Sequence, residues 1–327
     1  MVNLETTYAG LRLKNPFIVS SSGLTNSIKN IEEIEKAGAG AIVLKSLFEE
    51  QIRNEAGQLS DFSSHHTEAY DYINTYIEDN SIDNYLNLIR QAKMAVNIPV
   101  IASINCMKNK DWVDFAKQIE EAGADALELN IYTMAIDKTT EGFKYEEMYF
   151  EVVSTVQKVV KIPVIVKLGY YFTNLVYIIN RLSAMDVAGV VLFNRFFSPD
   201  IDINDFSIKP TNIFTNPQDF RASLRWIAIA SSKVKQIDFS ASTGIHDAET
   251  AIKMLLVGAQ TIQVCSALYK KGIPYLTEMI KGVEQWMISK NYNAVSDFRG
   301  KMAYLNIEDP ALFERSQFMK YFSSFEQ

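Results

Sequence analysis

The stretch Lys36-Ala-Gly-Ala-Gly-Ala-Ile-Val-Leu44 decides the fold, because it recurs further along the chain as Glu121-Ala-Gly-Ala-Asp-Ala-Leu-Glu-Leu129. In each copy a glycine follows a segment of helical spacing, and an apolar strand follows the glycine. Glycine in the left-handed conformation ends many helices, so both copies predict a helix-to-strand joint. Two weaker copies, 186–192 and 257–264, predict the same joint with the same role for their glycines. Such repetition indicates successive strand–helix units and therefore a parallel sheet.

Eight short apolar runs are predicted to be strands, and a segment of helical spacing follows each of them. The runs are Phe17–Val19, Ala41–Leu44, Val100–Ile104, Ala126–Leu129, Val164–Val166, Val190–Phe193, Gln236–Phe239 and Thr261–Val264. Eight strand–helix units in a chain of this size predict a single (β/α)8 TIM barrel, which typically needs about 250 residues. A doubly wound nucleotide-binding sheet is disfavoured, because no G-x-G-x-x-G turn follows the first strand.

The composition fits one α/β domain over residues 1–327, with 48% hydrophobic residues and no linker rich in proline or serine. The formal net charge of −7 argues against nucleic-acid binding. No run of about 18 apolar residues predicts a membrane span, and residues 1–10 do not resemble a signal peptide. The two cysteines, Cys106 and Cys265, fit a reducing compartment, so we expect a cytoplasmic protein.

Two segments fall outside the repeat. Residues 48–80 form a polar, aromatic-rich insertion after the second strand, far longer than the usual loop of about two to six residues. At the catalytic end of a barrel we expect such an insertion to form a lid or a substrate pocket, and the alternative is a surface excursion or a dimer contact. The C-terminal extension, 303–327, is aromatic and charged, and we expect it to pack on the outside of the barrel or on a partner subunit.

Most of the predicted strands end in a polar residue. Parallel strands that are buried on both faces are ordinarily plain apolar runs, so polar residues at the same end of successive strands predict a site at the barrel mouth. These residues are Lys45, Asn105, Asn130, Lys167, Asn194, Ser240, Cys265 and Ser266, together with Ser20–Ser22 after the first strand. No metal site is predicted, because the adjacent His65 and His66 point in different directions.

Lys45 and Lys167 are the sharpest clue among these residues. A lysine in a partly desolvated pocket pairs with an anion, such as a phosphate or a reduced cofactor, or reacts as a Schiff-base amine. The alternative is a structural lysine that pairs with Glu128 or another carboxylate. The asparagines offer donor and acceptor groups together, which suits a planar heterocycle with amide edges. The set therefore favours a flavin or a pyrimidine ring over a sugar.

Six segments near the strand ends occur in an order known from one family. They are Asn15-Pro-Phe-Ile-Val-Ser-Ser-Ser-Gly23, Val43-Leu-Lys-Ser46, Ala102-Ser-Ile-Asn105, Leu127-Glu-Leu-Asn130, Val166-Lys-Leu168 and Ser242-Thr-Gly-Ile245. With them the chain resembles the dihydroorotate dehydrogenases, in particular the soluble class 1 enzymes, and the related dihydropyrimidine dehydrogenase barrels. The resemblance runs from about Val2 to Lys301. It implies a barrel that holds FMN at its mouth, a dihydropyrimidine substrate in pyrimidine biosynthesis, and a homodimer.

The resemblance also implies which residues contact the cofactor. Lys167 would sit beside flavin N1 and O2, where negative charge develops on reduction, and Lys45 would bridge flavin and substrate. The other implied contacts to FMN are Ser22, Gly23, Asn194, Thr243, Gly244, Cys265 and Ser266. The last four would hold the phosphate on backbone N–H groups, at the usual phosphate position after the seventh and eighth strands.

For the substrate, the resemblance implies contacts through Lys45, Asn74, Asn105, Asn130 and Asn194. The implied reaction removes two hydrogens from a saturated C–C bond. A base takes the proton alpha to a carbonyl, and the neighbouring carbon gives hydride to flavin N5. Thr133 stands where class 1 enzymes have a cysteine base, so Thr133 and Lys45 are the predicted catalytic residues. Tyr132 and Cys106 are the alternative proton carriers.

Three departures from the family pattern bear on the substrate. The loop reads Asn130-Ile-Tyr-Thr-Met-Ala135 in place of Asn-x-Ser-Cys-Pro-Asn, the asparagine-rich substrate loop has no clear copy in 48–80, and the turn Ala241–Gly244 has one glycine. Two other hypotheses stay open: a Schiff-base lyase or aldolase that uses Lys45 or Lys167, and a diverged barrel that only binds a ligand. The electron acceptor is also open among fumarate, oxygen and a reductase subunit.

Overall fold

The computed structural model describes residues 2–48, 82–105, 111–196, 198–210 and 213–315. Eight parallel strands close into a barrel, because β4 pairs with β6 as well as with β3. In pairing order they are β4 (Ala41–Val43), β3 (Phe17–Val19), β13 (Thr261–Val264), β12 (Asp238–Ala241), β9 (Gly189–Leu192), β8 (Val164–Leu168), β7 (Ala126–Asn130) and β6 (Val100–Asn105). A short strand, β5 (Leu47–Phe48), also pairs with β6. The predicted (β/α)8 barrel is confirmed.

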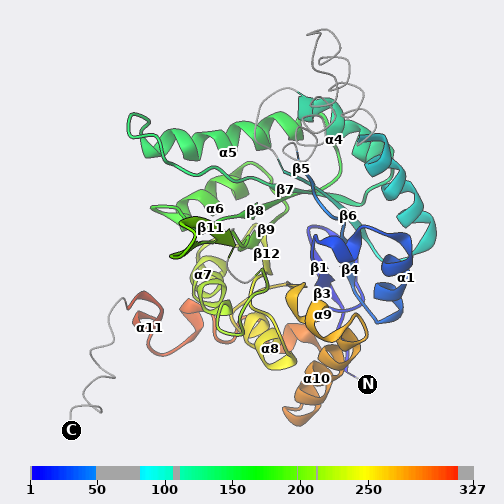
Figure 1. Ribbon diagram of the computed structural model, residues 1–327. Coiled ribbons are helices and arrows are strands. Elements are labelled where there is room, and N and C mark those ends of the chain that lie inside the picture. Colours follow the sequence, from blue (N-terminus) through cyan, green and yellow to red (C-terminus); the bar gives the residue numbers. More distant parts are fainter. Residues whose placement is uncertain (1, 49–81, 106–110, 197, 211–212, 316–327) are drawn as a thin grey trace, which may run out of the picture.

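Helices surround the strands (Figure 1). They are α1 (Ile28–Lys36), the helix 82–95, α4 (Asp111–Glu121), α5 (Gly142–Gln157), α6 (Leu175–Ala184), α7 (Phe220–Lys233), α8 (Ala248–Leu256), α9 (Ser266–Lys271) and α10 (Tyr275–Ser289). Apolar residues spaced three apart bury one stripe of each helix, as Ile31 and Ile34 do on α1. Both belong to the same apolar cluster as Phe17 and Val19 of β3.

The helix-to-strand joints form as predicted at three places. Gly38, Gly123 and Gly258 follow α1, α4 and α8 with φ angles of +101°, +98° and +114°. At the joint before β9 the prediction was wrong, because the left-handed residue is Asp186 (φ +59°) and Gly189 lies inside the strand. A Cβ at Gly189 would lie 3.0–3.1 Å from the ring and hydroxyl of Tyr8. The glycine there makes room for that side chain.

The barrel interior has an apolar floor and a polar upper layer. The hairpin of β1 (Thr6–Tyr8) and β2 (Leu11–Leu13) closes the N-terminal end, where Ala9 donates its N–H to Asp238 at the start of β12. The floor consists of Tyr8, Ala9, Leu13, Ile18, Ala41, Val43, Ile101, Ala126, Ile165 and Val191. Side chains alternate along a strand, so Glu128 and Lys167, two residues after floor positions, also point inward. They begin the polar layer beneath the mouth.

Several elements lie outside the eightfold repeat. The hairpin of β10 (Pro199–Asp202) and β11 (Ser207–Pro210) follows β9 and precedes α7. Short helical turns occupy Gly23–Thr25 (η1), Val295–Asp297 (η2), Tyr304–Asn306 (η3) and Ala311–Glu314 (α11). No helix within the described ranges is both long and apolar enough to cross a membrane.

The C-terminal extension packs on the outside of the barrel as far as residue 315. The N–H of Leu305 donates to Ser232 on α7, and Arg225 of α7 donates to the carbonyl of Arg315. Packing on the outside of the barrel was one of the two placements that we expected for the extension. Of the insertion 48–80, all residues after Phe48 lie outside the described residues, so its predicted role as a lid stays a prediction.

Candidate active site

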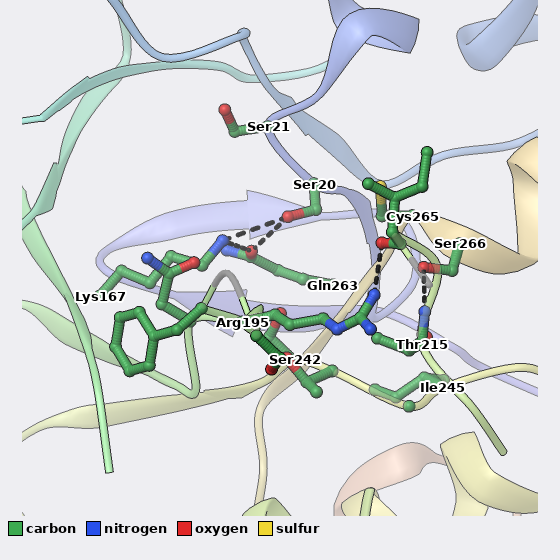
Figure 2. A pocket seen from close by; sticks show the side chains of 16 residues that line it. Ser20, Ser21, Lys167, Arg195, Thr215, Ser242, Ile245, Gln263, Cys265 and Ser266 are labelled. Atoms are coloured by element: carbon green, nitrogen blue, oxygen red, sulfur yellow. Dashed lines mark hydrogen bonds between the residues drawn. The ribbon is translucent and has the colours of Figure 1, made fainter. Parts of the chain in front are cut away.

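A cavity of about 350 Å³, here called the mouth cavity, opens at the carboxyl ends of the barrel strands (Figure 2). Its size lies within the usual range for small-molecule pockets, about 300–1,000 Å³. It is lined by Ser20, Ser21, Lys167, Asn194, Arg195, Phe196, Ser198, Ile213, Thr215, Ser242, Thr243, Gly244, Ile245, Gln263, Cys265 and Ser266. Carboxyl strand ends are where barrel enzymes hold their active sites, so this cavity is the candidate.

The Lys167 ammonium forms the inner end of the mouth cavity. Its Nζ donates to Ser20 Oγ at 3.3 Å and to Gln263 Oε1 at 3.2 Å (Figure 2). It also lies 3.6 Å from Glu128 Oε1. Gln263 in turn donates to Glu128 Oε2 at 2.7 Å. Lys167 is 6% exposed and Glu128 is 1% exposed. A buried charge is costly unless it is paired, so the two residues compensate each other beneath the cavity.

The opposite end of the mouth cavity is a sharp turn after β12. Thr243 and Gly244 both have left-handed backbones, with φ angles of +75° and +78°. A Cβ at Gly244 would lie 2.2 Å from the backbone nitrogen of Phe220, so glycine is required there. Thr243 donates its hydroxyl to the Phe193 carbonyl at 2.9 Å, which helps to hold a β-branched residue in this unfavourable region. Tight turns of this kind offer successive backbone N–H groups to an anion.

Loop 213–216 contacts both His246, which lies just after the turn, and α9. The Thr215 N–H donates to Ser266 Oγ at 3.1 Å, and Lys270 donates to the Thr215 carbonyl at 2.9 Å. The Thr215 hydroxyl lies 2.8 Å from His246 Nε2. Burial, and then the charge of Lys270, lower the pKa of His246, so its imidazole is neutral at pH 7. Lys270 is therefore the cationic side chain in this group.

Arg195 is a residue that the sequence interpretation missed. It follows Asn194 directly, and its guanidinium donates to the carbonyl of Ile213 across the mouth cavity (Figure 2). Ile213 lies two residues from Thr215, so the guanidinium reaches the same end of the cavity as the turn and α9. The only available signal was its position after a polar strand end, which by itself does not separate a ligand contact from a surface charge.

Asn130 and Asn194 are brought together, as expected for a shared site. Asn194 Nδ2 donates to Asn130 Oδ1 at 2.9 Å, and the β7–β8 register sets Asn130 opposite Lys167. Asn105 ends β6, and its buried Oδ1 finds no hydrogen-bond partner within the described residues. Ser240 was predicted to lie at a strand end on the barrel mouth, but it lies inside β12 and is fully buried. The strand runs two residues further than the apolar pattern indicated, so Ser242 takes the place at the mouth.

Other predicted residues lie away from the mouth cavity. Lys45 lines a separate cavity of about 350 Å³ beside the helix 82–95. The Thr133 hydroxyl donates to Met148 Sδ of α5 at 3.7 Å and faces a third cavity. Ser22 caps the turn η1, and a Cβ at Gly23 would lie 2.7 Å from the Tyr269 hydroxyl. Asn74 and Cys106 lie outside the described residues.

Cys265 and Ser266 line the mouth cavity, as the sequence suggested for the last strand end. Burial raises the pKa of the Cys265 thiol, against smaller opposite effects of a hydrogen bond with Ser22 and the charge of Lys167. The thiol is therefore protonated at neutral pH and acts as a small apolar side chain. Asp247 caps the start of α8, because its side chain accepts from the Thr250 N–H.

The mouth cavity fits FMN by the chemistry of its two ends. A buried ammonium at one end suits a ring edge that gains negative charge, and a strained turn with Ser266, Arg195 and Lys270 nearby suits a phosphate. The groups between them are mostly small or polar side chains, which leave room for a linear polyol. No cluster of histidine, cysteine or acidic residues in the described part of the chain could hold a metal ion.

Comparisons with known proteins agree with this geometry. A sequence profile of the family described as dihydroorotate dehydrogenase matches residues 3–287. The catalytic subunit of dihydroorotate dehydrogenase B (NAD(+)) from Thermoplasma volcanium is 25% identical over 309 residues, which cover 92% of this chain and 98% of that protein. Dihydroorotate dehydrogenase A (fumarate) from Lactococcus lactis subsp. cremoris is 26% identical over 328 residues, covering 92% and 100%. This chain therefore belongs to the dihydroorotate dehydrogenase family, whose members are oxidoreductases that act on CH–CH bonds.

Proposed function

We propose that the protein is an FMN-dependent oxidoreductase that oxidises dihydroorotate or a closely related dihydropyrimidine in pyrimidine biosynthesis. One observation carries the proposal: the buried Lys167 ammonium forms one end of a cavity that is also lined by the left-handed turn of Thr243 and Gly244. In keeping with the family resemblance, we also propose that it is a single-domain protein that acts in the cytoplasm as a homodimer. FMN, when bound, supplies the hydride acceptor.

Lys167 would hold the pyrimidine edge of a bound flavin, where its charge would stabilise the negative charge of the reduced ring. Glu128, whose Oε1 lies 3.6 Å from Nζ, helps to fix this ammonium in place. At the other end, the backbone of Thr243 and Gly244 would hold the cofactor phosphate together with Cys265 and Ser266. These assignments come from the family resemblance, and the cavity lining supports them because all four phosphate residues lie on it.

The paired amides of Asn130 and Asn194 would hold the substrate. Each amide has both a donor and an acceptor, which matches the alternating N–H and C=O groups of a dihydropyrimidine ring. Asn105, Lys45 and Asn74 are assigned to the same site by the family resemblance. Ser22 and Gly23, in the turn after β3, are assigned to the flavin on the same basis.

The proton acceptor is assigned to Thr133, in the loop between β7 and α5. Its hydroxyl is turned toward Met148, so it must rotate, or act through a water, to reach a substrate at the mouth. The neighbouring Tyr132 is a poor base, because burial and the nearby Tyr171 raise its pKa and keep it protonated. General-base assistance contributes about 10²- to 10⁴-fold, so this position controls much of the rate.

The ion pair also speaks against a Schiff-base lyase. The Lys167 Nζ donates to Ser20 Oγ and Gln263 Oε1 and lies 3.6 Å from Glu128 Oε1, so it would have to leave these partners before it could attack a carbonyl. The same lysine is well suited to stabilise a negative charge. The geometry therefore favours flavin chemistry at the mouth cavity.

The test is an absorbance spectrum of the purified protein, recorded without oxygen before and after the addition of dihydroorotate. We expect the bands of bound flavin, and their bleaching by the substrate. A flavin that stays oxidised would reject dihydroorotate as substrate while keeping the cofactor. A protein that binds no flavin, and whose substrate adduct is trapped by borohydride, would establish the lyase instead.

A further inference from the structure

A further cavity lies beside the mouth cavity, between the segment after β9 and the start of α7. We call it the β9–α7 cavity; its volume is about 380 Å³, close to the 350 Å³ of the mouth cavity. The residues that line both cavities are Asn194, Arg195, Phe196, Ser198 and Thr243. The two cavities therefore adjoin each other, and Asn194 lies where they meet.

Three aromatic rings form the apolar part of the lining. Tyr170 packs edge-on against the buried Phe193, with ring centroids 5.9 Å apart, and lies 5.7 Å from the Phe196 ring. A Cβ at Gly169 would lie 2.5 Å from Phe196 Cζ, so a glycine is needed for this ring to lie there. Aromatic surface combined with a few convergent polar groups is the usual composition of a small-molecule site.

Asp219 contributes a carboxylate to the β9–α7 cavity. It stands at the N-cap of α7, but its side chain accepts no hydrogen bond from the first turn of that helix. Instead its Oδ2 accepts the N–H of Asn216, another lining residue, at 2.9 Å. Its Oδ1 accepts no hydrogen bond from any residue that the structure describes. The carboxylate is therefore held in place by the loop and keeps one oxygen for a ligand.

Two hydroxyl groups add further acceptor oxygens to this lining. Ser223 Oγ donates to the Ser242 carbonyl at 2.7 Å, and Thr243 Oγ1 donates to the Phe193 carbonyl at 2.9 Å. Because their hydrogens are already used, these hydroxyl oxygens can only accept from a ligand. Together with the Asp219 carboxylate they favour a ligand that donates several hydrogen bonds and carries no negative charge. Adjacent hydroxyl groups of a sugar meet both conditions, and a carboxylate that binds ribose hydroxyls is known from dinucleotide sites.

Asn194 connects this sugar-like chemistry to the proposed reaction. Its amide pairs with that of Asn130, and this pair is proposed to hold the dihydropyrimidine ring. A ring held there would carry a substituent on one of its nitrogens toward the adjoining cavity. A free ring without such a substituent would leave the carboxylate of Asp219 unused.

We propose that the β9–α7 cavity binds a sugar attached to the dihydropyrimidine ring, so that the preferred substrate is a dihydropyrimidine nucleoside. This rests on the proposed function and narrows its substrate class. One ring carbon gives hydride to flavin N5, its neighbour gives a proton to the base, and a C=C bond forms between them. The bond to the sugar stays intact. Asp219 accepts hydrogen bonds from the sugar hydroxyls, and the aromatic rings pack against the C–H groups of the sugar.

The experiment compares uridine, uracil and 2′,3′-dideoxyuridine, which differ only in the sugar or its hydroxyls. Calorimetry measures the binding of each product analogue to the oxidised holoenzyme, so this part of the test needs no turnover. Asp219→Asn removes the charge but keeps the shape of the side chain and an acceptor for the Asn216 N–H. Asp205→Asn, at a carboxylate that is 70% exposed and lies outside the cavity, is the matched control.

Flavin reduction supplies the second readout. Anaerobic stopped-flow absorbance compares 5,6-dihydrouridine with 5,6-dihydrouracil, and dihydroorotate is included as the test of the proposed function. For dihydrouridine, Asp219→Asn should raise the concentration that gives half-maximal reduction by about tenfold, while the limiting rate changes by less than about twofold.

We expect uridine to bind at least about tenfold more tightly than uracil, and Asp219→Asn to remove most of this advantage. The affinities for uracil and dideoxyuridine should change by less than about twofold in Asp219→Asn, and Asp205→Asn should change none of the three. Uridine that binds no better than uracil, or an advantage that survives Asp219→Asn, would overturn the inference. If dihydroorotate still reduces the flavin in that case, the proposed function stands. Tight uridine binding to an enzyme that dihydroorotate does not reduce would support the nucleoside and reject dihydroorotate.

Discussion

Lys167 and Glu128 face each other inside the barrel, on the adjacent strands β8 and β7, with Nζ 3.6 Å from Oε1. Both side chains are buried, so neither charge is compensated by water. The carboxylate therefore controls how much positive charge the mouth cavity experiences. A cofactor that gains negative charge next to Lys167 competes with Glu128 for the same ammonium.

Glu128→Gln should raise the reduction potential of the bound flavin, because the ammonium is then compensated only by the reduced ring. Spectroelectrochemical titration of the holoenzyme measures this shift. The same change should destabilise the protein by roughly 3–5 kcal/mol, the usual cost of breaking a buried ion pair, as measured by urea unfolding of the cofactor-free form. An unchanged potential would show that Glu128 does not modulate the charge at the flavin.

Lys167→Met should remove most of the charge stabilisation at the flavin while keeping the length of the side chain. Loss of a positioned electrostatic group typically costs about 10²- to 10³-fold in rate, so flavin reduction by dihydroorotate should slow by this order. Lys45→Met is the comparison, since Lys45 lines a separate cavity in this structure. Equal losses of flavin reduction in the two variants would place Lys45 at the flavin as well.

Arg195→Leu should weaken FMN binding by about tenfold or more, because a charge-assisted contact to phosphate is lost. Riboflavin, which lacks the phosphate, provides the control. Its affinity should be unchanged by the substitution, and fluorescence titration of the cofactor-free protein measures both ligands. A similar loss for riboflavin would show that Arg195 acts through the shape of the cavity, through its bond to Ile213.

Thr133→Ala should slow flavin reduction by about 10²-fold, if the hydroxyl takes the proton as proposed. Tyr132→Phe should have little effect on this step, because the raised pKa of Tyr132 makes it a poor proton acceptor. Single-turnover reduction, monitored by flavin absorbance, measures both variants. A Thr133→Ala enzyme that is reduced at the normal rate would remove Thr133 from the mechanism.

His246 predicts a pH dependence of stability. Its pKa is lowered in the folded state, so between that value and about 6.5 the unfolded chain binds more protons than the folded one. The contribution of His246 to the free energy of unfolding should therefore be fully present above about pH 6.5 and be lost progressively as the pH falls below it. His246→Gln keeps a polar partner for Thr215 and should flatten this part of the profile. Urea unfolding between pH 5 and 8 provides the measurement.

Much of the barrel was predictable because its signals are local. The glycines at 38, 123 and 258 end helices in the left-handed conformation whatever surrounds them, and strands β3 and β13 begin and end where the apolar runs do. At Gly189 the local pattern failed, because the residue is selected by a distant neighbour, Tyr8.

The site was predictable to the level of strand ends and no further. Lys167, Asn130 and Asn194 meet because parallel strands end at the same edge of a sheet. Which way a loop side chain turns depends on packing that the order of residues does not reveal. Thr133 rests against Met148 on α5 for this reason, and Arg195 reaches loop 213–216 through a contact between distant segments.

The missing Cβ of Gly244 has a consequence beyond the shape of one turn. Because the backbone of Phe220 fills that space, the turn after β12 and the first residue of α7 are packed as one unit. The groups proposed to hold the phosphate are thus preorganised by the folding of α7, before any ligand arrives. Less ordering entropy is then lost on binding, which favours affinity. Mutations on the buried face of α7 should therefore change cofactor affinity without touching the cofactor.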